Sequence, residues 1–262
     1  MVRGLDLFRE RFRPFQGLMT LIGGAACDEW FTTNGLTFRA TNDLDLVIMM
    51  DDVPPGFIAA IRAFVAEGGY EISERSEGVP ILYRFSNPTR EDFPAKLELS
   101  SRKPDGFELS DGQKYIPVSA GLGRHSLSAI LLDDAYFGLI QTYHDERDGL
   151  WVANATALIP LKAHAWLNLT KAKEAGETVD SGNIKKHRAD VFGLAATLPG
   201  EAGPELPNAV TQEIAAFLRA FPATSTDWPA ILASLRSTLG IRATSEPLRA
   251  AIQTYFRLPP EQ

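Results

Sequence analysis

The sequence has a single cysteine and no long apolar run, and each of these features excludes a class of protein. Cys27 is the one cysteine among 262 residues, so the chain cannot form an intrachain disulfide or a cysteine-based zinc cluster. The N-terminal residues mix acids and bases without an apolar segment, and no later stretch approaches about 18 uncharged apolar residues. We therefore expect a cytoplasmic protein that does not enter a membrane.

Excess positive charge and paired histidines are also missing. The formal net charge of −7 at pH 7 argues against a protein that coats nucleic acid through a general basic surface, although it is compatible with a local basic groove. The histidines do not show a metal-ligand spacing such as His-x-x-x-His, since they stand at positions 125, 144, 164 and 187. Any polynucleotide contact should therefore be local.

The hydrophobic pattern changes near residue 150. Before this point, short alternating runs predict strands at 70–73, 81–85, 96–99 and 115–118, and helices are predicted at 25–33 and 55–66. After it, the apolar spacing predicts helices at 158–169, 184–198, 210–221, 228–239 and 245–256. We expect an α+β chain, with an α/β domain over residues 1–150 and a helical domain over residues 151–262.

One predicted strand of the first domain has a polar face suited to metal. From residue 38 to 48 alternate residues share one face, and this face carries Arg39, Thr41, Asp43 and Asp45. The two aspartates are two positions apart, so their Cα atoms are expected about 6–7 Å apart with side chains pointing the same way. This geometry suits one or two Mg²⁺ ions.

Two further features complete a phosphate and metal site. Gly23-Gly24 immediately precedes a predicted helix, where exposed N–H groups and the helix dipole can bind phosphate oxygens. A third acid should come from a neighbouring strand. Glu98, between two leucines, is the best candidate, and Glu71 is a weaker alternative.

These residues together resemble a known signature. Gly23-Gly24-Ala25 followed by Arg39-x-Thr41-x-Asp43-x-Asp45 resembles the signature of the nucleotidyltransferase superfamily that includes polymerase-beta-like enzymes. More narrowly, it is similar to bacterial nucleotidyltransferases of the abortive-infection toxin (AbiEii) type. Residues 159–163 (IPLKA) and 185–191 (KKHRADV) resemble the lysine and Lys/Asp motifs of such toxins. Many superfamily members have serine after the first glycine, so the hydroxyl contact to phosphate is missing here.

The resemblance implies a fold, an activity and roles for particular residues. The fold would be a nucleotidyltransferase-type mixed sheet with helices, followed by a helical region. The activity would be Mg²⁺-dependent transfer of a nucleotidyl group from an NTP to a hydroxyl of tRNA or protein, with release of pyrophosphate, in a toxin that has an antitoxin partner. The implied metal-binding and catalytic residues are Asp43, Asp45 and Glu98, and the implied nucleotide-binding residues are Gly23, Gly24, Arg39, Thr41 and Lys162.

Several residues have alternative interpretations. Arg39 would contact a phosphate or orient Asp43 or Asp45 through a salt bridge. Lys162 lies in an apolar run, where a lysine on a helix flank often extends to solvent. Asp190 could pair with Lys186 at i, i+4, and Lys185 and Lys186 are typical of a solvated helix face. Cys27 is interpreted as a structural thiol.

Two other functions fit the same residues. An antibiotic nucleotidyltransferase of the aminoglycoside type would share the Gly-Gly and Asp-x-Asp features, and the acidic charge suits a cationic acceptor. A non-catalytic nucleotide-binding protein of the same fold is the third hypothesis. The converging acids disfavour this third hypothesis. Clustered carboxylates repel one another, and a protein that only binds a nucleotide does not need them.

Overall fold

The computed structural model describes residues 2–50, 53–74, 80–102, 115–118 and 127–259. The chain divides into two compact units, of which the first comprises Met1–Ala26 and Ala40–Ala153 and the second comprises Cys27–Arg39 and Asn154–Gln262. A division at residue 150 assigns residues 27–39 to the first domain, whereas the structure assigns them to the second unit. Among the described residues, none of the helices combines the length and apolarity needed to span a membrane.

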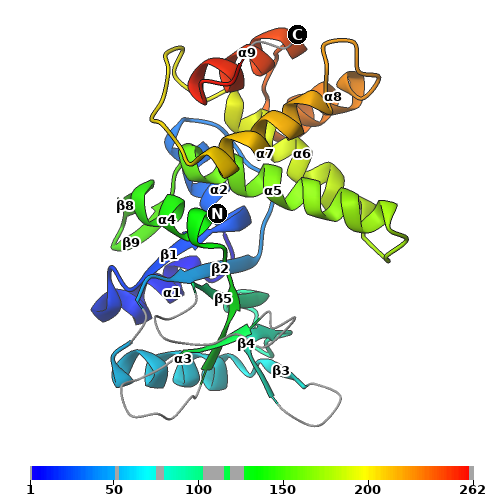
Figure 1. Cartoon of the computed structure of the whole chain (residues 1–262). Helices are drawn as coiled ribbons and strands as arrows, with labels where there is room; N and C mark the ends of the chain where they lie inside the picture. Colours follow the sequence, from blue (N-terminus) through cyan, green and yellow to red (C-terminus); the bar gives the residue numbers. More distant parts are fainter. Residues whose placement is uncertain (1, 51–52, 75–79, 103–114, 119–126, 260–262) are drawn as a thin grey trace. The chain divides into compact units, whose positions relative to one another are not determined.

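The first unit is built on a mixed sheet (Figure 1). Its main path runs in the spatial order β3 (Glu71–Glu74), β4 (Pro80–Ser86), β5 (Lys96–Ser101), β2 (Asp43–Ile48), β1 (Met19–Ile22), β9 (Leu150–Ala153) and β8 (His144–Arg147). β7 (Leu127–Leu131) pairs in parallel with β5 and antiparallel with β6 (Tyr115–Val118). β2 pairs antiparallel with β1 and parallel with β5. The expected α+β class with a mixed sheet is confirmed, and the specific nucleotidyltransferase arrangement stays a prediction.

The strand predicted over residues 38–48 is shorter than expected. β2 begins at Asp43, so Arg39 and Thr41 precede the strand and do not share its polar face. The register explains the difference, because β1 ends with Ile22 opposite Asp45 and β5 begins with Lys96 opposite Asp43. Residues before 42 therefore extend beyond the ends of both neighbouring strands.

Aromatic side chains pack two helices of this unit, α1 (Leu5–Phe12) and α3 (Pro55–Gly68), against each other. The helices meet through rings that include the pairs Phe8–Phe64 and Phe12–Phe57. Phe8 and Phe57 are fully buried, and each such side chain stabilises the fold by about 1.5–3 kcal/mol. A one-turn 3₁₀ helix, η1 (Arg13–Phe15), follows α1, and α4 (Asp134–Thr142) lies later in the unit.

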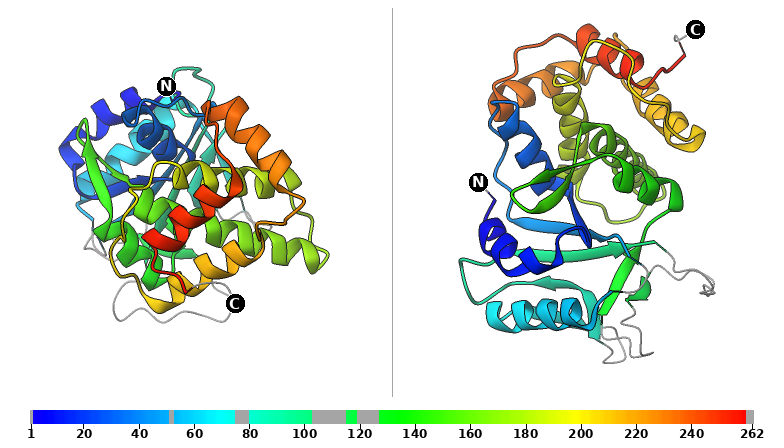
Figure 2. Two further views of the ribbon diagram at one scale, coloured as in Figure 1. Left: turned by 90° about the horizontal axis from the view of Figure 1, so that it is seen from above. Right: turned by 90° about the vertical axis from the view of Figure 1, so that its left-hand side faces the viewer.

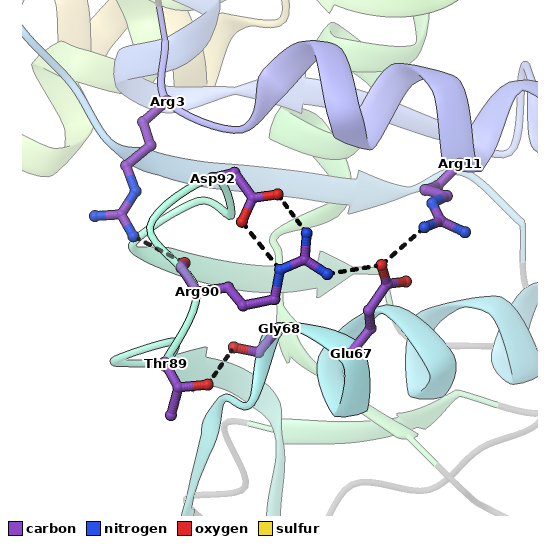
Figure 3. A network of polar contacts seen from close by, with 7 residues as sticks. All are labelled: Arg3, Arg11, Glu67, Gly68, Thr89, Arg90 and Asp92. Carbon is purple, nitrogen blue, oxygen red and sulfur yellow. Dashed lines mark hydrogen bonds and ion pairs between the residues drawn. The ribbon is translucent and has the colours of Figure 1, made fainter.

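A polar network around Arg90 ties the loop before β5 to both helices (Figure 3). Arg90 donates to both carboxylate oxygens of Asp92 and to Glu67 at the end of α3. Glu67 also accepts from Arg11 of α1 at 2.8 Å, and Arg3 donates to the Arg90 carbonyl at 3.1 Å. These groups are exposed, so salt should weaken the network. It fixes the chain just before β5 enters the sheet.

The second unit is helical. It contains the later part of α2 (Gly23–Thr33), followed by α5 (Ala155–Glu174), α6 (Ser181–Ala195), α7 (Asn208–Arg219), α8 (Trp228–Leu239) and α9 (Ser245–Tyr255). The five helices predicted after residue 150 are therefore confirmed. α6 contacts α5, α8 and α9 (Figure 2), and its Phe192 packs against Phe217, Phe221 and Trp228. The side chains of Asn154 and Asp180 cap the N-termini of α5 and α6.

Candidate metal and phosphate site

The two aspartates of β2 lie on one face of the sheet, as the alternation predicts. Asp43 and Asp45 are partly exposed, whereas Leu44 and Leu46 between and after them are fully buried on the opposite face. This pattern follows from the period of two in a strand. The leucines anchor the strand, and the carboxylates project from its other side.

The neighbouring strands add three charged residues to this face. In the parallel register, Lys96 of β5 lies opposite Asp43, and Glu98 lies opposite Asp45. In the antiparallel register, Arg84 of β4 lies opposite Glu98. Paired residues of adjacent strands project from the same face of a sheet. The structure therefore brings the predicted third acid beside Asp45, and it adds two cations that the sequence analysis did not assign to the site.

Both oxygens of Glu98 are occupied by these cations. Arg84 donates to Glu98 Oε1 from Nε at 3.0 Å and from Nη2 at 2.7 Å. Lys96 Nζ lies 2.8 Å from Glu98 Oε2 and 3.2 Å from Asp43 Oδ2. The Glu98 side chain is 11% exposed and that of Lys96 is 30% exposed. The ammonium of Lys96 is thus held between two carboxylates.

Burial and charge act in opposite directions on these groups. Burial by itself raises the pKa of Glu98, but the hydrogen bonds and charges of Lys96 and Arg84 outweigh it and hold the pKa below its ordinary value. For Lys96, burial lowers the pKa, whereas the hydrogen bond to Glu98 and the charges of Glu98, Asp45 and Asp43 raise it, and the net direction is upward. The face therefore carries an ionised acid and an ionised lysine in direct contact.

The glycine pair lies against the second aspartate. Gly23 is the first residue of α2 and has φ 71°, a left-handed conformation that favours glycine. A Cβ atom at this position would overlap Asp45 Oδ2 and lie 2.9 Å from Asp45 Cγ. Gly23 thus permits the close approach of Asp45 to the helix N-terminus. The Gly-Gly motif predicts phosphate binding, but a motif read along one segment does not predict this contact with Asp45.

The oxygen donors on this face bear on whether it can hold Mg²⁺. Among the residues that the structure describes, histidine, cysteine, aspartate and glutamate do not form a group of three or more that could hold a metal ion. Glu98, the predicted third ligand, is engaged by Arg84 and Lys96. The carboxylates of Asp43 and Asp45 are hard oxygen donors of the kind that Mg²⁺ accepts. Lys96 pairs with Asp43 and Glu98, so the two aspartates would suit Mg²⁺ only if substrate phosphates and water completed its coordination.

The alternative third acid lies elsewhere in the sheet. Glu71 is on β3, which β4 and β5 separate from β2. Its carboxylate accepts a hydrogen bond of 2.7 Å from Asn87 Nδ2. Glu71 therefore does not share the acidic face with Asp43 and Asp45.

Three other charged residues meet in the second unit. Asp190 accepts from Arg39 Nη2 at 2.9 Å and lies 3.0 Å from Lys162 Nζ. Arg39 is thus paired with Asp190, and its role toward phosphate or a β2 aspartate stays a prediction. Lys162 is 5% exposed, so its ammonium does not extend to solvent. The role of Lys162 in nucleotide binding stays a prediction.

Charge pairing outweighs burial in this cluster. Burial raises the pKa of Asp190, but Lys162 and Arg39 together hold it below its ordinary value. Burial lowers the pKa of Lys162, whereas the negative groups around it, including Asp190, raise it overall. All three groups of the cluster therefore depend on one another for charge neutralisation.

Two neighbours of this cluster have shifted pKa values. Burial raises the pKa of the Cys27 thiol to about 12, and the residue is fully buried. A protonated, buried thiol is a poor nucleophile, which agrees with a structural role. Burial and the charge of Lys162 lower the pKa of His187 to about 4, and its buried Nδ1 atom lacks a hydrogen-bond partner among the described residues.

Comparisons of this chain with protein families, curated proteins and solved structures found no significant match.

Proposed function

We propose that the first unit carries a Mg²⁺-dependent nucleotidyltransferase site, which transfers a nucleotidyl group from an NTP to an acceptor hydroxyl and releases pyrophosphate. The observation that supports this proposal is the contact between Asp45 and Gly23. This contact places the acidic strand face beside the N-terminus of α2. Carboxylates of the face can bind a metal ion, and N–H groups at the helix N-terminus can bind the triphosphate.

Each residue of the site has a part in the proposed reaction. Asp43 and Asp45 would hold the Mg²⁺, which supplies positive charge to the phosphates. The backbone N–H groups at Gly24 and the first turn of α2 bind phosphate oxygens. In the metal-free protein Lys96 supplies a positive charge beside the carboxylates. In that state Glu98 is ion-paired at both oxygens, positions Lys96 and Arg84, and is a weak proton acceptor.

The proposed step is an in-line displacement at the α-phosphorus. The acceptor oxygen forms a bond to this phosphorus, and the bridging bond to the β-phosphate breaks. Pyrophosphate leaves with the electron pair of that bond, and the proton of the hydroxyl passes to a carboxylate of the face or to water. The chain holds the reacting groups in place and neutralises the negative charge that accumulates.

The acceptor is proposed at the level of its chemical class. A hydroxyl of tRNA or of a protein is the leading acceptor, in the setting of a toxin with an antitoxin partner. The net charge of −7 supports a second candidate, a cationic small molecule of the aminoglycoside type, because an acidic protein attracts a cationic acceptor.

A transfer assay tests the proposal. The protein is incubated with each α-labelled NTP and Mg²⁺, together with total tRNA, cell protein or aminoglycosides. We expect label on one acceptor class with the wild type, and a loss of at least about 100-fold in the Asp43→Asn/Asp45→Asn double variant. Asp148→Asn is the matched control, since Asp148 is on a turn of the same unit at φ 47°, where asparagine is tolerated.

Thermal melts give a second readout. Mg²⁺ at about tenfold above its Kd should stabilise the wild type and the Asp148→Asn control by about 1.4 kcal/mol. The double variant should lose this gain. An equal Mg²⁺-dependent shift in all three proteins would show that the ion binds elsewhere, and it would contradict the proposal.

A further inference from the structure

A lysine ammonium occupies the acidic face where the proposed metal ion would act. Lys96 Nζ contacts Asp43 Oδ2 at 3.2 Å and Glu98 Oε2 at 2.8 Å, and its charge also interacts with that of Asp45. The lysine and all three acids come from the adjacent strands β2 and β5. One side chain of the protein thus already neutralises the carboxylates.

We propose that Lys96 is a tethered counter-cation, which neutralises the acidic face in the metal-free protein and moves to phosphate oxygens of the nucleotide when a divalent cation binds. This inference rests on the metal and nucleotide binding of the proposed function, but it does not depend on the transfer reaction. It makes Lys96 a regulator of metal uptake at the site.

Electrostatics require the displacement. An ammonium and a divalent cation that share the carboxylate of Asp43 would lie within a few ångströms of each other and repel strongly. Of the two, the lysine can move, because its charge is carried on a flexible four-carbon stem. Its side chain is 30% exposed, so it can swing toward solvent without opening a buried cavity.

Glu98 is not left without a counter-charge after this movement. Arg84 binds Oε1 through two nitrogens, whereas Lys96 binds Oε2. When Lys96 leaves, the two hydrogen bonds that Arg84 donates to Oε1 can persist, so Glu98 keeps one positively charged partner. The division of the two oxygens between the two cations therefore allows one cation to depart alone.

The displacement should couple the two ligands. A divalent cation alone must break the contacts of Lys96 with Asp43 and Glu98. A bound triphosphate offers the released ammonium new oxygen partners, so nucleotide should favour metal binding and metal should favour nucleotide binding. Removing the ammonium should strengthen the binding of metal alone and weaken this coupling.

The experiment measures Mn²⁺ binding by electron paramagnetic resonance, with and without a non-hydrolysable NTP. Lys96→Met keeps an unbranched stem and removes the charge, and Lys96→Gln is a second variant in case the first folds poorly. Arg147→Met is the matched control, because it removes a positive charge from an ion pair with Asp145 on β8, which β1 and β9 separate from β2 in the same sheet. Circular dichroism confirms that each protein is folded.

We expect both Lys96 variants to bind Mn²⁺ alone at least about 10-fold more tightly than the wild type, with a coupling to nucleotide at least about 5-fold smaller. Arg147→Met should change the Mn²⁺ affinity less than about 3-fold. Unchanged or weaker Mn²⁺ binding in the Lys96 variants would overturn the inference, and so would an equal gain in Arg147→Met. A wild type that binds Mn²⁺ and nucleotide but transfers no label would contradict the proposed reaction alone.

Discussion

Replacement of Asp190 by asparagine should strongly destabilise the second unit. Asp190 is the common carboxylate partner of Arg39 and Lys162, at 2.9 Å and 3.0 Å. The side chains of Asp190 and Lys162 are 4% and 6% exposed, and that of Arg39 is 20% exposed. Asparagine keeps the shape of the side chain but removes its charge, so two largely desolvated cations lose their counter-ion.

The expected cost follows from this burial. Removing one partner of a buried ion pair costs about 3–5 kcal/mol, because the remaining charge is left uncompensated. Asparagine still offers one carbonyl acceptor, so we expect a value near the lower end, about 3 kcal/mol. The double variant Lys162→Met/Asp190→Asn should cost less than Asp190→Asn alone, because it also removes one of the uncompensated cations.

Urea unfolding monitored by tryptophan fluorescence measures this cost. Trp30, Trp166 and Trp228, three of the four tryptophans, belong to the second unit. The control is Glu205→Gln, which removes the 3.3 Å pair with Arg257 in the same unit, where the side chains are 86% and 50% exposed. Such an exposed pair should cost no more than about 1 kcal/mol.

Two outcomes would refute this reasoning. If Asp190→Asn lowers the unfolding free energy by no more than the Glu205→Gln control, the two cations must reach solvent in the folded protein. If the loss of unfolding free energy in the double variant equals the sum of the losses in Lys162→Met and Asp190→Asn, Lys162 and Asp190 are not coupled.

Three further predictions concern single positions. Gly23→Ala should cost about 1–2 kcal/mol in urea unfolding, because the left-handed φ disfavours alanine, and it should weaken Mn²⁺ binding, because the new Cβ displaces Asp45. The pKa of His187 is about 4 in the folded protein and about 6.5 in the unfolded chain. Between about pH 4 and 6.5, therefore, the imidazole is protonated in the unfolded chain and neutral in the folded protein. The unfolding free energy of the wild type should therefore fall by about 3 kcal/mol as the pH drops from about 6.5 to 4. The His187→Gln variant should lack this part of the pH dependence. Cys27, fully buried with its pKa raised to about 12, should react with a thiol reagent such as DTNB only after the protein unfolds.

Each of these predictions has a result that would contradict it. Unchanged Mn²⁺ affinity in Gly23→Ala would mean that Asp45 does not depend on the space beside Gly23. Equal pH profiles of the wild type and His187→Gln would show that His187 is protonated as easily in the folded chain as in the unfolded one. Rapid labelling of the native protein would place Cys27 at an accessible surface.

Local sequence patterns determined many elements of this protein and the acids of the charged strand face. The buried leucines at 44 and 46 and the acids at 43 and 45 follow from the period of two in a strand. The helices after residue 150 follow from apolar spacing along single segments. Such patterns depend on neighbours within a few positions, so the sequence alone is enough to predict them.

Strand register and helix packing decided the rest. Only the parallel register of β2 and β5 places Glu98 beside Asp45 and Lys96 beside Asp43, and a shift by one residue would turn these side chains to the other face. Likewise, Arg39 pairs with Asp190, which is 151 positions away in the chain. A residue's counter-charge depends on which segments pack together, and this is set by the burial of apolar surface over the whole unit, not by the residues beside it in sequence.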